Sequence, residues 1–296
     1  MSLTIKVPQN FNLKAIDRFL SNVVTSHFHP SDAIITIDFA DLNHTDGVGI
    51  TVLSNTVEWL MQFGVQVLFL NNDKVKRPGV EYLYECGFFD RYLGATRQTN
   101  WLWRRNSLPC SPVQYVGAHS WLEHRFTPWM AQTLCVPESA LGTLRTCLKE
   151  LFNNIGDHAN VGSGFIHVQH YPARHSVGVT LSDFGVGIPS SMATRFPNLS
   201  DAAAIKHACE EGVTSKSRHT NMGIGLSHLS TAILANDGAV RIHSGTGFLH
   251  RWKDDKGRTC ERVGNGTGRY PGTLIDLQLE TRMFVGDDDI RENLEW

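Results

Sequence analysis

The sequence predicts an α/β protein with two domains. Its 296 residues are enough for two domains of ordinary size. The first hundred residues or so alternate strand-like apolar runs with helix-like periodicity, which is typical of parallel α/β units. The second half begins with a long amphipathic helix and continues with strand-like segments and a helix that starts with glycines. We expect an N-terminal α/β domain over residues 1–95, a connector over 96–136 and a second α/β domain over 137–296.

The composition is that of a globular protein, with 41% hydrophobic and 19% charged residues. The net charge of −2 gives no overall attraction for nucleic acid or for an anionic membrane, so neither is an expected partner. The six cysteines form no CxxC pair and no zinc-finger spacing, which favours reduced thiols in a cytoplasm. The N-terminus has no signal-peptide core, and no apolar run reaches membrane-spanning length. We therefore expect a soluble cytoplasmic protein.

Four segments define the first domain. The run DAIITIDFADL (Asp32–Leu42) is rich in isoleucine and predicts a buried strand. A helix follows the loop NHTDGVG and ends at Gly64, because glycine is favoured just past the end of a helix. A second strand is predicted over Val65–Asp73 and a second helix over Val80–Cys86. This alternation predicts that the strands pair in parallel.

The loop TDGVGI gives this domain a resemblance to STAS domains, the small α/β modules of anti-sigma-factor antagonists. Asp46, Gly49 and Ile50 match the family's loop of the type D-S-S-G-L. Gly47 and Val48 stand where the family has serines, one of which can be the phosphoacceptor. Because neither residue has a hydroxyl group, we expect the family's phosphorylation switch to be absent here. The resemblance implies regulation through contacts with a protein partner.

The connector is rich in tryptophan and proline. It holds four of the seven tryptophans: Trp101, Trp103, Trp121 and Trp129. We expect these side chains to pack between the domains, with an aromatic groove for a peptide as the alternative. The stretch SLPCSP (residues 107–112) predicts a turn-rich break, and a helix is predicted to begin or to be interrupted near Pro128.

An amphipathic helix opens the second domain. Pro137 and Glu138 suit its first turn, where proline is tolerated and a carboxylate faces the positive end of the helix dipole. Its apolar stripe recurs at spacings of three and four: Leu141, Leu144, Leu148, Leu151 and Ile155. Glu150, Asn154 and His158 form a polar row that borders this stripe. The helix alone leaves two interpretations open, the wall of a cleft or a solvated flank.

The remaining segments alternate strands and helices. GFIHVQHYP and HSVGVTLSDFG predict two strands that pair antiparallel across a turn near Ala173. Ser200 is a suitable N-cap for a helix that starts at Asp201. MGIGLSHLSTAILANDG predicts a helix with Gly223 and Gly225 at its start, where backbone N–H groups can bind an anion. AVRIHSG and GTLIDLQLE predict two further strands.

Four short motifs follow one another along this second domain. They are Glu150, Asn154, His158 and Ala159; Asp183, Gly185 and Gly187; Gly223, Gly225 and Leu226; and Gly272 and Thr273. Their order, and their positions on the expected elements, resemble the GHKL family of ATP-binding domains, which includes DNA gyrase, bacterial histidine kinases and anti-sigma-factor kinases. The resemblance implies an α/β sandwich, a mixed sheet with helices on one face, that binds ATP and Mg²⁺.

The resemblance assigns the adenine end of the site to the second and fourth motifs. Asp183 is expected to accept a hydrogen bond from the adenine amino group. Gly185 and Gly187 are expected to let the base lie against the backbone, and Thr273 to support the adenine pocket.

The phosphate end is assigned to the first and third motifs and to the lid between them. Asn154 is expected to give its side-chain oxygen to Mg²⁺, a hard cation that prefers oxygen ligands. Asp157 and His158 are expected to line the phosphate side. Gly223 and Gly225, followed by Leu226, are expected to receive phosphates through backbone N–H groups. From the lid, either Lys216 or Arg218 is expected to reach the phosphates, and the sequence leaves open which.

Glu150 is the residue that distinguishes the functions this family allows. As a catalytic residue it orients or activates a water in ATP hydrolases, and it can act on an acceptor hydroxyl in kinases. The leading hypothesis is therefore a slow ATPase or ATP-driven switch that controls a protein partner through the STAS-like domain or the lid. The alternatives are a serine/threonine protein kinase of the anti-sigma type and a non-catalytic nucleotide-dependent adaptor. The sequence leaves open whether the protein forms a homodimer.

Overall fold

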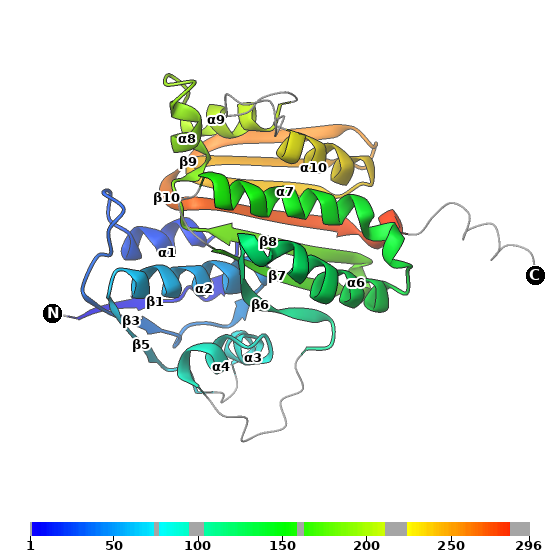
Figure 1. Cartoon of the computed structure of the whole chain (residues 1–296). Helices are drawn as coiled ribbons and strands as arrows, with labels where there is room; N and C mark the ends of the chain where they lie inside the picture. Colours follow the sequence, from blue (N-terminus) through cyan, green and yellow to red (C-terminus); the bar gives the residue numbers. More distant parts are fainter. Residues whose placement is uncertain (1, 74–76, 95–103, 159–162, 211–223, 285–296) are drawn as a thin grey trace, which may run out of the picture.

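The computed structural model describes residues 2–73, 77–94, 104–158, 163–210 and 224–284. Helices pack on parallel and antiparallel sheets, so the predicted α/β class is confirmed (Figure 1). The parallel pairs lie in the N-terminal part and the antiparallel pairs in the C-terminal part. Within the described ranges, no helix combines the length and the apolar character needed to cross a membrane.

Three parallel strands in the order β1-β3-β5 form the N-terminal sheet. They are β1 (Leu3–Lys6), β3 (Ile34–Asp38) and β5 (Gln66–Leu70). Helix α1 (Ile16–Val23) lies between β1 and β3 in the chain, and α2 (Gly47–Gln62) lies between β3 and β5, as parallel neighbours require. The two predicted strands and the helix between them are confirmed, and β1 and α1 extend the predicted unit.

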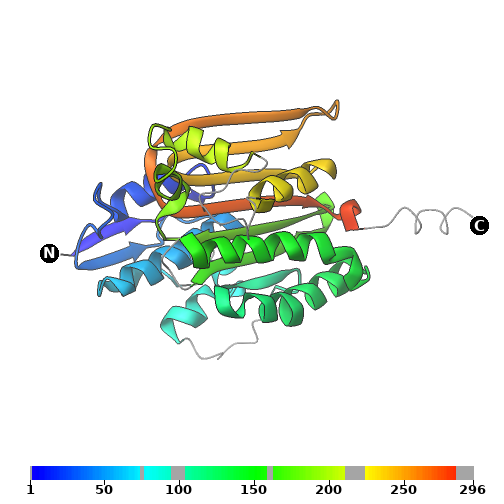
Figure 2. The same ribbon diagram turned by 45° about the horizontal axis from the view of Figure 1, so that its top comes forward.

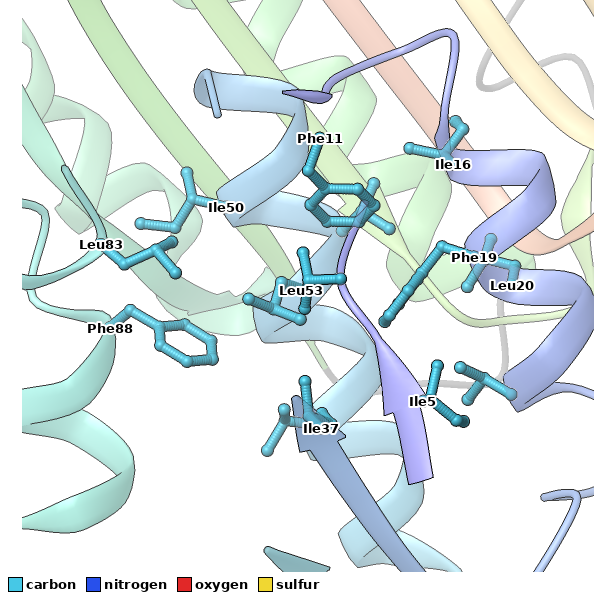
Figure 3. Packing of buried hydrophobic residues seen from close by; sticks show 14 of the residues in the cluster. Ile5, Phe11, Ile16, Phe19, Leu20, Ile37, Ile50, Leu53, Leu83 and Phe88 are labelled. Carbon is cyan, nitrogen blue, oxygen red and sulfur yellow. The ribbon is translucent and has the colours of Figure 1, made fainter. Parts of the chain in front are cut away.

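Short elements complete this part: β2 (Asn10–Phe11), β4 (His44–Thr45), α3 (Pro78–Glu85) and α4 (Phe88–Leu93). Figure 3 shows how Ile5 of β1, Phe19 of α1, Ile37 of β3, Leu53 of α2 and Phe88 of α4 lie together in the core of this part. Helix α2 is buried along almost its whole length. The reason is that its second side faces the C-terminal sheet, which contributes side chains to the same core.

The C-terminal sheet has five antiparallel strands in the order β6-β7-β8-β10-β9. They are β6 (Ser107–Gln114), β7 (Ser163–Tyr171), β8 (Ser176–Asp183), β9 (Ala239–Lys253) and β10 (Thr259–Glu280). Strands β7 and β8 are joined by a 3₁₀ turn at Pro172–Arg174, which confirms the predicted antiparallel pair.

Helices cover both faces of this sheet, with α7 (Gly142–His158) and α10 (Ile224–Ala235) on one face and α2 on the other (Figures 1 and 2). Side chains along β7 alternate between the two sides. Ile166 and Val168 belong to the core beneath α7, whereas Phe165 belongs to the core around α2. Both faces of the sheet are therefore buried.

Two further helices, α8 (Gly187–Ala193) and α9 (Asp201–Ala208), pack near β9. Ser200 Oγ accepts a hydrogen bond from the Ala203 N–H at 3.2 Å, so the predicted N-cap is confirmed. The cap satisfies a backbone donor that the first turn of the helix would otherwise leave unpaired.

Strand β9 folds back on itself. Fully extended, its 15 residues would span about 50 Å. Lys253 Nζ at its end nevertheless lies 3.1 Å from Asp237 Oδ1, just before its start. The chain reverses near Gly245, where φ is +59°, and Asp201 accepts hydrogen bonds from the N–H and hydroxyl of Thr246 there. The predicted strand AVRIHSG is confirmed as the first half of β9, and the return half is additional.

One prediction for the connector is wrong. The stretch SLPCSP does not break the structure but forms most of β6, the edge strand of the five-stranded sheet. Prolines fit there because one side of an edge strand needs no backbone donor. The register with β7 also shifts between Leu108 and Ser111. The three-part division of the chain stays a prediction.

The predicted helix near Pro128 is interrupted as expected. Helix α5 (Ala118–Trp121) runs into a π-helical turn (Leu122–Phe126), which runs into α6 (Thr127–Leu134). Proline lacks the N–H that a continuous α-helix would use, and a wider turn before it accommodates that loss.

The expectation that the connector tryptophans pack between the domains is wrong for two of them. Trp121 and Trp129 pack against the core beneath α7. The ring of Trp121 lies 5.9 Å from that of Phe126 and 6.3 Å from that of Phe152. Trp101 and Trp103 lie outside the described residues.

Candidate functional site

Asp183 is a buried carboxylate at the end of β8, with 4% of its surface exposed. Its Oδ1 accepts a hydrogen bond from the Gly185 N–H at 2.7 Å, and Thr273 lies opposite it on β10. Burial raises the pKa of Asp183 to about 7, although backbone N–H groups of Gly185 and Thr273 favour the ionised form. No basic side chain of the described residues forms an ion pair with it. Asp183 is therefore a buried acceptor without a cationic partner among the described residues.

Glycines bring the backbone close around this carboxylate. Gly187 has φ of +77°, and a Cβ there would lie 2.7 Å from Ser244 Oγ and 2.8 Å from the Gly272 carbonyl oxygen. Gly272 has φ of +91°, and a Cβ on it would collide with the carbonyl oxygen of Asp183. Only glycine fits both positions, because other residues meet a strained φ and a backbone clash.

Ser244 is a residue of this site that the sequence did not mark. It is fully buried in the first half of β9, and its hydroxyl donates to the Gly272 carbonyl oxygen at 2.5 Å. Ser244 Oγ also accepts a hydrogen bond from the Ile188 N–H at 2.9 Å and lies 3.4 Å from Thr273 Oγ1. Ser244 thus joins the first turn of α8 to the middle of β10. The one signal in the sequence is a small polar residue that ends the apolar alternation of AVRIHSG.

The first motif lies on α7. The stripe of Leu141, Leu144, Leu148 and Leu151 is buried, which confirms the predicted face of this helix. Glu150 is half-buried beside that stripe. Asn154, Asp157 and His158 belong to the last turns of α7, but their side chains lie outside the described part of the structure. Whether this row lines a cleft stays a prediction.

The third motif lies at the start of α10. Gly225 is in the first turn of this helix, and Leu226 packs, half-buried, against the core beneath α7. Gly223 and the lid residue Lys216 lie outside the described residues.

The sheet register relates these elements to Asp183. Phe165, near the start of β7, pairs with Ser182, so the chain that leaves α7 enters the sheet beside the end of β8. Ala239, just after α10, pairs with Gln278, which is far from the Asp183 end of β10. Since α10 leads into that far end, its start points toward Asp183. The C-terminus of α7 and the N-terminus of α10 are therefore directed to the same end of the sheet.

The STAS-like loop lies against the five-stranded sheet. Asp46 caps α2 by accepting a hydrogen bond from the Gly49 N–H at 3.0 Å. A Cβ on Gly47 would lie 3.1 Å from the His167 ring and 3.3 Å from Thr180 Oγ1. Glycine at the family's serine position thus allows close contact between α2 and the sheet. The resemblance to STAS domains itself stays a prediction.

Comparisons with known proteins add little support for the resemblance to ATP-binding domains. No family model matches the chain, and no curated protein sequence matches it. Solved structures similar to it include two of the ATPase region of Saccharomyces cerevisiae topoisomerase II, one of them bound to ICRF-187 (dexrazoxane). Each match has 10% identity and a TM-score of 0.26, and covers 42% of this chain and 35% of the topoisomerase chain. The chain thus spans about a third of their length, and so low a TM-score does not establish a shared fold.

Proposed function

We propose that the protein binds ATP, with Asp183 as the group that recognises adenine. The observation that carries this proposal is a carboxylate buried beside backbone N–H donors, with no cationic partner among the described residues and with its pKa raised to about 7. A carboxylate can accept about four hydrogen bonds, so it has capacity for a donor such as the adenine amino group. Gly187 and Gly272 let the chain after β8 pack closely on β10, which fixes the backbone around the Asp183 carboxylate. An adenine amino group is a donor that this carboxylate would accept.

The proposal extends to the phosphate end through residues that the sequence assigns. Asn154 would supply a side-chain oxygen to Mg²⁺, and Asp157 and His158 would lie beside the phosphates. The start of α10, with Gly223 and Gly225, would offer backbone N–H groups. Bound Mg²⁺ would neutralise phosphate charge and orient the terminal phosphate. The directions of α7 and α10 toward the Asp183 end are consistent with this arrangement.

The function we favour is that of a slow ATPase, or ATP-driven switch, that regulates a protein partner. Glu150 would orient the attacking water, and the N-terminal STAS-like part would contact the partner. Helix α2 of that part packs on the sheet that carries Asp183, which gives nucleotide binding a physical path to it. A serine/threonine protein kinase of the anti-sigma type is the alternative, and a non-catalytic adaptor is the third.

Calorimetric titration with Mg-ATP tests the binding proposal. We expect Asp183→Asn to weaken ATP binding about tenfold or more, because a hydrogen bond to a charged acceptor is lost. The matched control is Asp276→Asn, a second buried carboxylate on the same sheet whose partners are Thr180 and Arg241. No ATP binding by the wild-type protein, or equal losses in both variants, contradicts the proposal.

Labelled γ-phosphate separates the three functions. The protein is incubated with Mg²⁺ and [γ-³²P]ATP, alone and with cell lysate, beside Glu150→Ala and the neighbouring exposed control Lys149→Ala. Free phosphate that disappears only in Glu150→Ala supports hydrolysis. Label on another protein supports a kinase, and ATP binding with neither product supports an adaptor.

A further inference from the structure

Helix α2 is hydrogen-bonded to the strand that carries Asp183. Asn55 Nδ2 donates to Ser182 Oγ at 2.9 Å, a bond between residues 127 positions apart in the chain. Ser182 Oγ is also hydrogen-bonded to the hydroxyl of Tyr270 on β10. Asn55, Ser182 and Tyr270 are all buried, so their bonds are shielded from water.

Two of these residues, Ser182 and Tyr270, lie beside the proposed adenine-recognition residues in sequence. Ser182 directly precedes Asp183, and Tyr270 comes two residues before Gly272 and three before Thr273. Because side chains alternate along a strand, Ser182 points to the α2 side of the sheet while its neighbour Asp183 points to the other. The hydrogen bonds therefore hold the end of β8 and the middle of β10 together on the α2 face of the sheet, opposite the face to which Asp183 points.

The ring of Phe184, directly after Asp183, is packed on some sides and borders a cavity on another. The ring of Phe184 meets Trp59 of α2 at 5.8 Å and Tyr270 at 5.5 Å, in edge-to-face contacts. Phe184, Asn55 and Trp59 also line a cavity of about 380 Å³. A ring that borders a cavity lacks packing on that side and resists displacement less. Hydrogen bonds through Ser182 are then the more rigid restraint on the loop after β8.

We infer that Asn55 and Tyr270 are positioning residues for the nucleotide site, holding Asp183 and Thr273 at the spacing that the adenine base requires. This inference rests on the proposed function. It makes α2 of the N-terminal part a structural component of the nucleotide site. Neither residue touches the nucleotide, and both act through Ser182.

The test compares two buried tyrosine hydroxyls that bond side chains of this sheet, that of Tyr270 on β10 and that of Tyr82 on α3. Tyr270→Phe removes only the hydroxyl that bonds Ser182 and keeps the ring against Phe184. Tyr82→Phe is the matched control, because Tyr82 donates to Gln169 at 2.7 Å and contacts His167 Nε2 at 3.1 Å, on β7 rather than on a strand of the site. If the two hydroxyls only stabilise the fold, both variants should change the Kd for ATP to a similar extent. If Tyr270 positions the site, only Tyr270→Phe should weaken nucleotide binding.

The readouts are the Kd for ATP, the Kd for inosine triphosphate, and the unfolding midpoint of each variant. Inosine triphosphate carries a carbonyl in place of the amino group that Asp183 would accept from. We expect Tyr270→Phe to bind ATP about tenfold more weakly and to discriminate less between the two nucleotides. We expect Tyr82→Phe to stay within about twofold of wild type for ATP although its midpoint also falls. Asn55→Ala repeats the test from the side of α2. Because Asn55 and Tyr270 both bond Ser182, the double variant should lose less ATP-binding free energy than the sum of the two single variants.

The outcomes separate the inference from the proposed function. If wild type binds ATP and Asp183→Asn weakens it, but Tyr270→Phe and Asn55→Ala leave the Kd unchanged, the inference is wrong and the proposed function stands. Equal weakening by Tyr82→Phe and Tyr270→Phe also overturns it. If wild type does not bind ATP, both are wrong. Selective weakening by the Asn55 and Tyr270 variants supports the inference.

Discussion

Two aspartates are buried in the five-stranded sheet, and their surroundings differ. Asp276, 7% exposed, accepts a hydrogen bond from Thr180 at 2.9 Å and pairs with Arg241 at 2.7 Å. Asp183, 4% exposed, accepts a bond from the Gly185 N–H and has no cationic partner among the described residues. A buried carboxylate is costly unless it is paired. The contacts of Asp276 explain its burial, whereas for Asp183 we propose a ligand as the missing partner.

The largest expected change in the free energy of unfolding is that caused by substitution of Asp276. Asp276→Asn should lower the free energy of unfolding by about 2–3 kcal/mol, because it weakens a charge-assisted bond and leaves Arg241 without its anion. Urea denaturation at pH 7 measures this. Asn is close to Asp in size, so packing is retained and the loss reports the charge. An unchanged midpoint would mean that Asp276 is no more structural than Asp183.

For Asp183→Asn we expect the opposite change, an increase in the free energy of unfolding. The folded pKa of Asp183, about 7, lies above the ordinary aspartate pKa of 3.8, so ionisation costs folded-state stability as pH rises from about 4 to 7. Asp183→Asn removes this cost and should stabilise the nucleotide-free protein by about 1–2 kcal/mol at pH 8, and by much less at pH 5. Denaturation at the two pH values checks this. Equal destabilisation at both would contradict the comparison.

Nucleotide affinity should follow the same titration. A donor such as the adenine amino group favours the ionised carboxylate, so ATP binding at the site requires proton loss from Asp183 when the pH is below about 7. We expect the Kd for ATP to rise about tenfold between pH 8 and pH 6. The Asp183→Asn variant controls for the titration of ATP itself, and its profile should be flatter. Parallel profiles would show that Asp183 is not the group concerned.

The smallest expected changes in stability and in ATP affinity are those caused by substitution of Ser244. Ser244→Ala removes the hydroxyl that joins the Gly272 carbonyl to the Ile188 N–H. We expect a loss of about 1 kcal/mol in unfolding free energy, with a comparable loss in ATP affinity. Ser191→Ala is the control, since its hydroxyl bonds only the Gly187 carbonyl within α8. Equal effects of the two changes on ATP affinity would remove Ser244 from the site.

Local patterns in the sequence were sufficient for much of the fold. The stripe of α7, the cap at Ser200 and the strand pair β7-β8 each depend on residues a few positions apart, and all three are confirmed. Failures came where distant contacts override local preference. SLPCSP contains two prolines and still forms a strand, because its partner β7 and its edge position permit it.

The same distinction applies to the site. Asp183, Gly187 and Gly272 stand in recognisable motifs, and the structure brings these three together. Asn55 and Tyr270 carry no such signal, because their importance depends on contacts across 127 and 88 positions of the chain. Pairing at that separation is a property of the folded sheet and α2 together. The motif residues Asn154, Asp157 and His158 stay predictions, because their side chains lie outside the described part of α7.

The account depends most on Asp183 as the acceptor of an adenine donor. The direct measurement is the ratio of the dissociation constants for ATP and inosine triphosphate, in wild type and in Asp183→Asn. We predict that wild type prefers ATP by about a hundredfold, since a carbonyl facing a buried carboxylate leaves both groups unpaired. The ratio should fall toward one in the variant. Equal affinity of the wild type for the two nucleotides, or a ratio unchanged by Asp183→Asn, would contradict the account.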